Sequence, residues 1–488
     1  MRYNNGMIPR NRALGYKVLS WLVLAVVAGA AVVCLRWWLA YDPAKDFVEF
    51  IPGMDGSLGV PKPAAETVRI GEFGEAFNVT PAALAGSWPR FRGPDASNIS
   101  HETTRLAERW GEAGPKLLWS VDLGEGHAAP VVNNGRVYVL DYDEARRADA
   151  LRCFSLRDGR EIWRRWYRVN VKRNHGMSRT VPAVTDKYVV TIGPRCHVMC
   201  VDAVSGALLW GMDLEKDFGA VVPLWYTGQC PLIDGGVAVF AASGKKALVL
   251  GVDCETGAVL WQTPNPDGWE MSHSSVMPMT LNGKKMYVYA AVGGIAGVSA
   301  EKGDRGTVLW KTAGWNPSVV VPSPVVFPDG RVFVTAGYGA GSMMLKVSEE
   351  EGAYRVNSLY KIRPQEGLAC EQQTPVLYEG LLFGILPNDA GELRNQFVCF
   401  DPDGKILWAS GKDHLFGLGP YMTADGKFFI LSDEGVLTAA RASTEKFVPL
   451  DQARVLQGRD SWGPIALAGG RMLLRDSRRM VCIDVAAP

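Results

Sequence analysis

The chain has 488 residues with 52 basic and 51 acidic side chains, so its formal net charge is +1. That balance gives no indication of a nucleic-acid partner, because proteins that bind phosphate backbones carry basic patches. Nine cysteines in a chain of this length are too few for a disulfide-rich scaffold.

The first predicted element is a membrane-spanning helix. Residues 18–35 contain no charged side chain, and Trp37 and Trp38 extend the apolar stretch past Arg36. About 20 apolar residues cross a bilayer as a helix, and aromatic residues gather at its interfaces. The stretch is longer than the apolar core of a signal peptide, and no A-x-A cleavage site follows it. We therefore expect a retained transmembrane signal anchor over residues 18–41.

Charges on either side of this segment predict its orientation. Residues 1–17 form a basic tail that contains Arg2, Arg10, Arg12 and Lys17 and no acidic residue. Cytoplasmic flanks of membrane helices are enriched in lysine and arginine. The sequence therefore predicts a single-pass protein of a bacterial inner membrane, with the amino terminus in the cytoplasm and the rest in the periplasm.

Two connecting segments follow the anchor. Residues 42–87 are rich in proline and glycine, which interrupt helices and strands, so we expect a linker. Phe73 and Phe77 are unusual in a solvated linker, and part of it is expected to fold back on the main domain. Residues 88–116 are predicted to pack on that domain as a lead-in segment.

From residue 130 onward, two phrases alternate. One is a proline followed by apolar residues, a glycine turn and an alternating strand. The other is a turn and strand of the type Asp-x-x-x-Gly-x-x-Leu-Trp, as in the run from Asp202 to Trp210. The turn requires the local hydrogen bonds of aspartate and the positive φ of glycine. The proline phrase recurs every 44–52 residues, at Pro130, Pro182, Pro231, Pro278, Pro324, Pro375, Pro420 and Pro464.

Each of the eight units reads as four short strands, which is typical of a β-propeller. The last unit has only three strands, whereas Leu117, Leu118 and Trp119 supply a fourth before the first unit. We therefore predict an all-β fold: an eight-bladed propeller of four-stranded antiparallel blades over residues 117–488, preceded by a transmembrane helix. An amino-terminal strand over residues 117–123 closes the last blade and leaves no open edge in the ring.

Four cysteines share one position, just before the turn phrase: Cys153, Cys200, Cys399 and Cys482. We interpret them as small buried apolar residues. Cys196 and Cys200 are four residues apart, about 13 Å on a strand, which is too far for a disulfide.

The Gly-x-x-x-Trp ending resembles the tryptophan-docking motif of the quinoprotein alcohol dehydrogenase-like propellers, which carry pyrroloquinoline-quinone-like (PQQ-like) repeats. This resemblance implies that a tryptophan of one blade packs on the glycine turn of its neighbour. The fifth and seventh units end at Tyr360 and Val448 without the motif, so docking is expected to be incomplete. The docking residues would be Trp119, Trp163, Trp210, Trp261, Trp310 and Trp408.

Candidate ligand-binding residues lie just before the repeat prolines, because this part of a blade borders the central channel. They are His127, Arg179, Gln229, His273, Ser274, Glu371, Gln372 and Trp462. Arg179 is suited to an anion, and the histidines to acid–base chemistry. Equally, a polar funnel is expected in any wide ring. No residue is assigned as catalytic, and no metal site is predicted.

The resemblance implies two classes of function. Catalytic members use PQQ and Ca²⁺ at the central mouth, whereas BamB-type members bind protein segments and catalyse nothing. Ca²⁺ needs 6–8 oxygen ligands, and Glu371 is the lone carboxylate among these positions. We therefore expect a membrane-anchored scaffold for envelope proteins that needs no cofactor. The alternatives are a PQQ- and Ca²⁺-dependent alcohol or sugar dehydrogenase, and a propeller that binds a carbohydrate or another small ligand.

Overall fold

The computed structural model describes residues 10–40 and 68–488, in two units. In the first, α1 (Arg10–Ala40) is a helix whose Val18–Ala40 stretch is long and apolar enough to cross a membrane. Its described side chains are all exposed, as expected for a helix whose partner is lipid. Membrane anchors and signal sequences share these features. Residues 42–67 of the predicted linker and the first nine residues of the basic tail lie outside the described residues.

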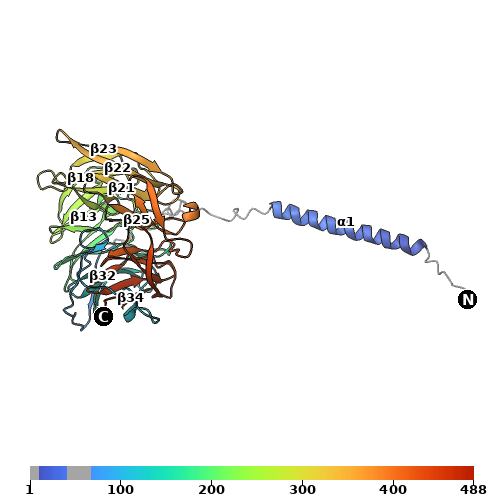
Figure 1. The fold of residues 1–488 in the computed structure, drawn as a ribbon, viewed down its shortest axis with the longest axis horizontal. Helices are drawn as coiled ribbons and strands as arrows, with labels where there is room; N and C mark the ends of the chain where they lie inside the picture. Colours follow the sequence, from blue (N-terminus) through green and yellow to red (C-terminus); the bar gives the residue numbers. More distant parts are fainter. Residues whose placement is uncertain (1–9, 41–67) are drawn as a thin grey trace, which may run out of the picture. The chain divides into compact units, whose positions relative to one another are not determined.

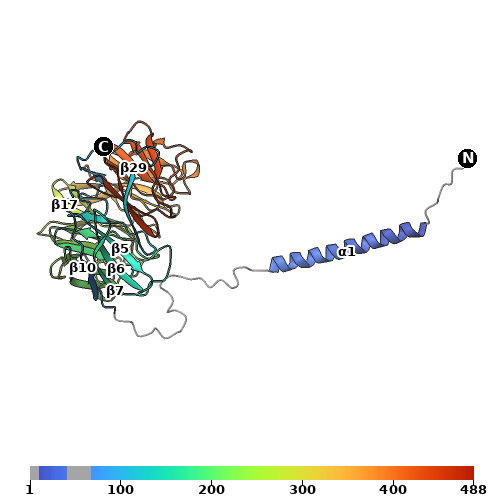
Figure 2. The same ribbon diagram turned by 90° about the horizontal axis from the view of Figure 1, so that it is seen from below.

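The second unit is a ring of eight antiparallel sheets, which follow one another in chain order (Figures 1 and 2). This confirms the predicted eight-bladed propeller. Blade 1 contains β4 (Val131–Asn133), β5 (Arg136–Asp143), β6 (Ala148–Ser155) and β7 (Glu161–Arg168). Blade 2 contains β8 (Ala183–Val184), β9 (Tyr188–Ile192), β10 (His197–Asp202) and β11 (Leu208–Asp213). Blade 3 contains β12 (Leu232–Asp234), β13 (Val237–Ala241), β14 (Val249–Asp253) and β15 (Val259–Gln262). Blade 4 contains β16 (Met277–Leu281), β17 (Lys284–Ala291), β18 (Gly294–Ser299) and β19 (Val308–Thr312).

The remaining blades repeat the plan. Blade 5 contains β20 (Val325–Val326), β21 (Arg331–Ala336), β22 (Gly341–Glu350) and β23 (Ala353–Ile362). Blade 6 contains β24 (Val376–Tyr378), β25 (Leu381–Ile385), β26 (Phe397–Asp401) and β27 (Lys405–Ala409). Blade 7 contains β28 (Tyr421–Ala424), β29 (Lys427–Leu431), β30 (Val436–Arg441) and β31 (Val448–Arg454). Blade 8 contains β32 (Ala466–Ala468), β33 (Arg471–Arg475) and β34 (Arg479–Asp484), joined by β3 (Lys116–Asp122). Two short helical turns, α2 (Leu214–Phe218) and η1 (Gly391–Leu393), lie in connections.

The ring is closed as the strand count predicted. β3 pairs with β34 in antiparallel register, with Trp119 opposite Cys482. Every blade thus has its four repeat strands, and the sheets of blades 1 and 7 each gain a fifth strand, β1 (Phe73–Ala76) and β2 (Ile99–Ser100) respectively. Buried apolar side chains lie between neighbouring sheets, as in the cluster that joins Val132 of blade 1 to Leu473 of blade 8.

Tryptophan docking occurs around half of the ring. Trp119, Trp163, Trp210 and Trp261 each lie against a turn glycine of the following blade, namely Gly159, Gly206, Gly257 and Gly306. The indole N–H of Trp210 also donates to the carbonyl of Cys254 at 2.9 Å. Blade 5 lacks the motif, and Trp310 instead donates to the sulfur of Met286. Trp408 donates to the carbonyl of Thr444, in a blade without the glycine turn.

The shared cysteine position is explained by the same packing. Cys153, Cys200, Cys399 and Cys482 are the cross-strand partners of docking tryptophans, and each is fully buried. Glycine takes this position in blades 3 and 4, where a Cβ on Gly251 or Gly297 would lie within about 2.1 Å of the indole. Because little space remains beneath the indole, this position requires a small residue. All nine cysteines are free thiols.

The predicted boundary between linker and folded domain requires correction. Residues 68–87 are not a free linker: β1 (Phe73–Ala76) pairs with β7 as a fifth strand on the outer edge of blade 1. The Phe73 ring stacks on Trp166 at 4.1 Å, which matches the expectation that phenylalanines here fold back. An aromatic pair of this kind adds about 1 kcal/mol beyond its buried area.

Candidate functional site

The lead-in segment crosses the central channel. Trp88 exchanges two backbone hydrogen bonds with Val132 in blade 1, and the carbonyl of Pro89 accepts one from Val184 in blade 2. On the far side, β2 (Ile99–Ser100) pairs with β28 of blade 7, the one parallel pairing in the described sheets. The segment thus joins opposite sides of the ring and seals one end of the channel.

Arg92 fastens this segment to the sixth blade. Its guanidinium is buried and donates to the carbonyls of Ala96, Ser97, Thr374 and Pro375 at 2.8–2.9 Å. All three guanidinium nitrogens are used in this way. Burial lowers the pKa of Arg92 to about 10, so the charge is retained at neutral pH and is stabilised by backbone dipoles.

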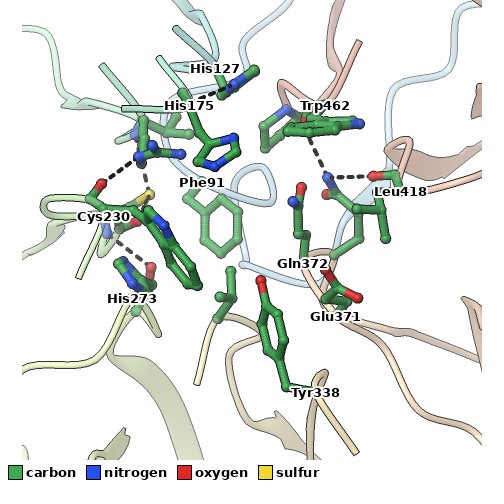
Figure 3. A pocket seen from close by; sticks show the side chains of 18 residues that line it. Phe91, His127, His175, Cys230, His273, Tyr338, Glu371, Gln372, Leu418 and Trp462 are labelled. Carbon is green, nitrogen blue, oxygen red and sulfur yellow. Dashed lines mark hydrogen bonds between the residues drawn. The ribbon is translucent and has the colours of Figure 1, made fainter. Parts of the chain in front are cut away.

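Above the seal lies a blind cavity of about 300 Å³. Figure 3 shows its lining side chains around Phe91, which comes from the lead-in segment. The size is that of a small-molecule site, at the lower end of the usual range. Its walls come from the seal and from residues of all eight repeats: Phe91, His127, His175, Arg179, Val181, Trp225, Gly228, Cys230, His273, Ser275, Val321, Tyr338, Glu371, Gln372, Gln373, Leu418, Trp462 and Pro464.

Six of the eight candidate residues line this cavity: His127, Arg179, His273, Glu371, Gln372 and Trp462. Gln229 and Ser274 do not. Gln229 is fully buried, and its amide pairs with both backbone groups of Ala241. Ser274 is also fully buried, and its hydroxyl contacts the carbonyl of Ser275 at 3.5 Å. Both side chains contact backbone groups inside the propeller and are not among the residues that line this cavity.

Arg179 is the cationic group of the cavity. It donates through Nε to the carbonyl of Trp225 and through Nη2 to the carbonyls of Asn174 and Gly176. Burial lowers its pKa to about 10, which leaves it charged at neutral pH. No carboxylate of the described residues forms an ion pair with it. A buried cation that only backbone oxygens stabilise favours an anionic ligand.

Two of the three histidines that line the cavity, His127 and His273, are neutral. Burial and the charges of Arg179 and Arg475 lower the pKa of His127 to about 3. Nε2 of His127 lies 3.1 Å from the carbonyl of His175, so this nitrogen carries the hydrogen and Nδ1 is left as an acceptor. Burial and Arg179 likewise lower the pKa of His273 to about 4. Nδ1 of each ring is buried and has no partner among the described residues.

Glu371 stands on the opposite wall. Burial raises its pKa, and repulsion from Asp389 and Asp433 raises it further. Gln372 beside it projects into the cavity (Figure 3). Asp433 accepts from the indole N–H of Trp462 at 2.8 Å and thereby fixes that ring at the cavity wall.

Aromatic rings complete the walls. Trp225 stacks on His273 at 6.3 Å and on Tyr338 at 5.9 Å, and Trp462 packs against His127 at 4.9 Å. The backbones of His175, Trp225 and Tyr338 have positive φ of 50°, 61° and 56°. Left-handed backbone is costly for bulky side chains and tends to occur at binding sites. Sequence reasoning missed Trp225, Tyr338 and Phe91; the glycines that flank Tyr338 were the signal that its loop adopts unusual backbone.

The lining does not fit a PQQ and Ca²⁺ centre. Glu371 is the one carboxylate among the lining residues, and no group of three or more potential metal ligands occurs in residues 10–40 and 68–488. Ca²⁺ sites need 6–8 oxygen ligands, of which carboxylates supply the charge. The described residues of the cavity therefore lack the ligands that would hold a Ca²⁺–quinone pair.

Comparisons with known proteins agree with the fold. Residues 147–356 match the family described as outer membrane protein assembly factor BamB. The quinoprotein alcohol dehydrogenase PedH of Pseudomonas putida is 25% identical over 189 residues, which are 38% of this chain and 30% of that protein. The chain thus matches less than a third of that relative's length.

Among solved structures, a europium-containing methanol dehydrogenase superposes with a TM-score of 0.55 at 13% identity, over 82% of this chain and 89% of that one. BamB from Moraxella catarrhalis superposes with a TM-score of 0.48 at 13% identity, over 76% and 99% of the two chains. Likeness at this identity concerns the fold. A shared fold does not by itself assign an activity.

Proposed function

We propose that this PQQ-like repeat propeller is a membrane-anchored binding protein that holds a small ligand in its central cavity and catalyses no reaction. One observation carries the proposal. The lead-in segment seals the channel, so the mouth becomes a blind, partly aromatic cavity of about 300 Å³ with an unpaired Arg179 in its wall. A protein scaffold needs neither the seal nor the buried charge.

The proposed setting is the periplasmic face of a bacterial inner membrane. Support comes from the apolar stretch Val18–Ala40 and from the arginines and lysine that precede it. We propose that this stretch is a retained anchor, that the amino terminus is cytoplasmic and that the propeller is periplasmic.

A second candidate is a scaffold for envelope proteins, as the name of the matching family suggests. The observation in its favour is a set of exposed leucines on outermost strands. Leu260 on β15 and Leu407 on β27 are 52% and 48% exposed, on edges that no other described strand covers. Open edges with apolar side chains are suited to pairing with another chain.

The test begins with the full chain, purified in mild detergent and extracted under denaturing conditions. Mass spectrometry of the extract should reveal a small molecule that is released by the wild type. Arg179→Gln should lose most of that molecule, because its charge is removed from the cavity wall. Arg479→Gln is the matched control, since this arginine lies outside the cavity and is 52% exposed.

Three outcomes contradict the proposal. Equal retention of the molecule by Arg179→Gln places the ligand elsewhere. Dye reduction with added PQQ, Ca²⁺ and an alcohol or sugar identifies an oxidoreductase instead. Crosslinks from Leu260 and Leu407 to another envelope protein, without any bound small molecule, favour the scaffold.

A further inference from the structure

The two unpaired charges of the cavity lie on opposite walls. Arg179 precedes β8, the innermost strand of blade 2, whereas Glu371 precedes β24, the innermost strand of blade 6. In a closed ring of eight blades that follow one another in chain order, the second and the sixth are diametrically opposed. The two side chains do not form an ion pair across the cavity.

Arg179 differs from the other two buried arginines near the channel. Arg92 and Arg475 each donate from all three guanidinium nitrogens to backbone carbonyls, so their hydrogen-bonding capacity is used. Arg179 uses Nε and Nη2, and its Nη1 donates to none of the described residues. It is also the one of the three that lines the cavity. A free guanidinium nitrogen at a cavity wall is suited to an anionic oxygen.

Glu371 carries the opposite charge and likewise has no ionic partner among the described residues. Its carboxylate forms neither an ion pair nor a hydrogen bond with any residue of the two described ranges. Asp389 and Asp433 repel its negative charge, and no cation of the described residues compensates. A positively charged group placed beside Glu371 would relieve that repulsion. His127 and His273 are neutral, and Arg179 and Glu371 are the one arginine and the one carboxylate among the described residues that line this cavity.

We propose that the ligand is a zwitterion, whose anionic group binds Arg179 and whose cationic nitrogen binds Glu371. This inference rests on the proposed function. The body of the ligand lies over Phe91 and beside Gln372, between the rings of Trp225 and Trp462. A cavity of about 300 Å³ holds on the order of ten water-sized groups, which fits an amino acid or an amino sugar acid rather than a polymer.

The test compares zwitterions with their singly charged analogues by calorimetry on the full chain in detergent. One set is para-(aminomethyl)benzoate with para-methylbenzoate and para-methylbenzylamine. The other is the series of ω-amino acids from β-alanine to aminocaproate, with caproate and hexylamine. At least one zwitterion should bind tenfold or more tightly than both of its analogues, and the optimum chain length reports the span between the two charges.

Variants assign the two ends. Glu371→Gln should lower the affinity for the zwitterion to that for the matched anion, and should leave affinity for the anion unchanged. Arg179→Gln should abolish binding of the anion and weaken the zwitterion. Affinity of the wild type for the zwitterion should fall as the pH is lowered through the raised pKa of Glu371, because only the ionised carboxyl pairs with a cation.

The inference is overturned if the anion binds as tightly as the zwitterion, if Glu371→Gln changes nothing, or if no probe of either set binds. Its failure is distinguishable from that of the proposed function. A released molecule that carries only negative charge and requires Arg179 would remove the zwitterion and leave the binding protein intact.

Discussion

A buried carboxyl in blade 1 makes the stability of the propeller depend on pH in an unusual direction. Asp149 on β6 is 1% exposed, and its Oδ2 accepts from the hydroxyl of Tyr167 at 2.9 Å. Its Oδ1 has no partner among the described residues. Burial raises the pKa of Asp149 to about 7, the Tyr167 hydrogen bond opposes this, and nearby Asp141 adds to it.

The sign follows from proton linkage. In the unfolded chain an aspartate has a pKa of about 3.9. Between about pH 4 and pH 7 the folded protein therefore keeps a proton that the unfolded chain has released, and the free energy of unfolding falls by roughly 1.4 kcal/mol per pH unit. Over this window the loss is on the order of 4 kcal/mol. Below about pH 4 the contribution is complete, and above about pH 7 it is gone.

Asp149→Asn should remove this dependence, because the amide oxygen still accepts from Tyr167 and no charge is buried. A folded unit of this length loses only about 1 °C in Tm per kcal/mol, from an unfolding entropy of roughly 2.1 cal/mol/K per residue. Thermal scans of the full chain in detergent should show the Tm of the wild type falling by about 4 °C relative to the variant between about pH 4 and pH 7.5.

The control is Asp253→Asn, in an exposed turn where hydrogen bonds from Thr256 lower the pKa of the aspartate. The stabilising contribution of Asp253 is complete above about pH 4 and is lost only as the pH falls below that value, so its difference curve should be flat between about pH 4 and pH 7.5. A flat difference between wild type and Asp149→Asn across the window would refute the argument that this carboxyl is buried and protonated.

Two further predictions concern glycines. Gly206→Ala should lower the free energy of unfolding by about 2–5 kcal/mol, because a Cβ there would lie 2.5 Å from the Trp163 indole and φ is +69°. Gly426→Ala is the control: φ is +66° but the space around it is open, so it should lower the free energy of unfolding by only about 1–2 kcal/mol, and equal falls in Tm for the two variants would show that indole docking contributes nothing. Gly228→Ala should weaken binding of any cavity ligand and also lower the stability, because its Cβ would lie 2.8 Å from Cβ of the buried His273 and force that ring to shift. Calorimetry that gives an unchanged affinity would place the ligand away from His273.

Local chemistry explains why the blades were predictable. The proline phrase and the Asp-x-x-x-Gly turn each specify backbone geometry within a few residues, and the tryptophan endings report contacts to the next repeat. The last unit lacks one strand, and β3 alone has the matching tryptophan ending with no unit of its own, so their pairing follows from the repeat pattern. The docking of β1 on β7 was not predictable to the residue, because an edge strand accepts many partners and only tertiary packing selects one.

The site was predictable only in part. Six of the residues chosen for their place near a repeat proline line the cavity. That place in the sequence does not say which way a side chain points, and the amide of Gln229 pairs with the backbone of Ala241 instead. Trp225 and Tyr338 lie in loops where both residues have left-handed backbone, which their side chains do not predict. Phe91 reaches the cavity only because the lead-in segment crosses the channel, and no local sequence pattern encodes that path.

Because β3 pairs with β34, the ring can close only near the end of synthesis. The two strands meet at Asp122 and Arg479, which are 357 residues apart. At about 5–20 residues per second, a ribosome needs roughly 20–70 s to make the chain between them. For that interval β3 has no edge to pair with and the channel has no complete ring to be sealed within. The newly made chain therefore spends most of its translation time as an open arc of blades with two unpaired edges, and the ring closes only when β34 arrives.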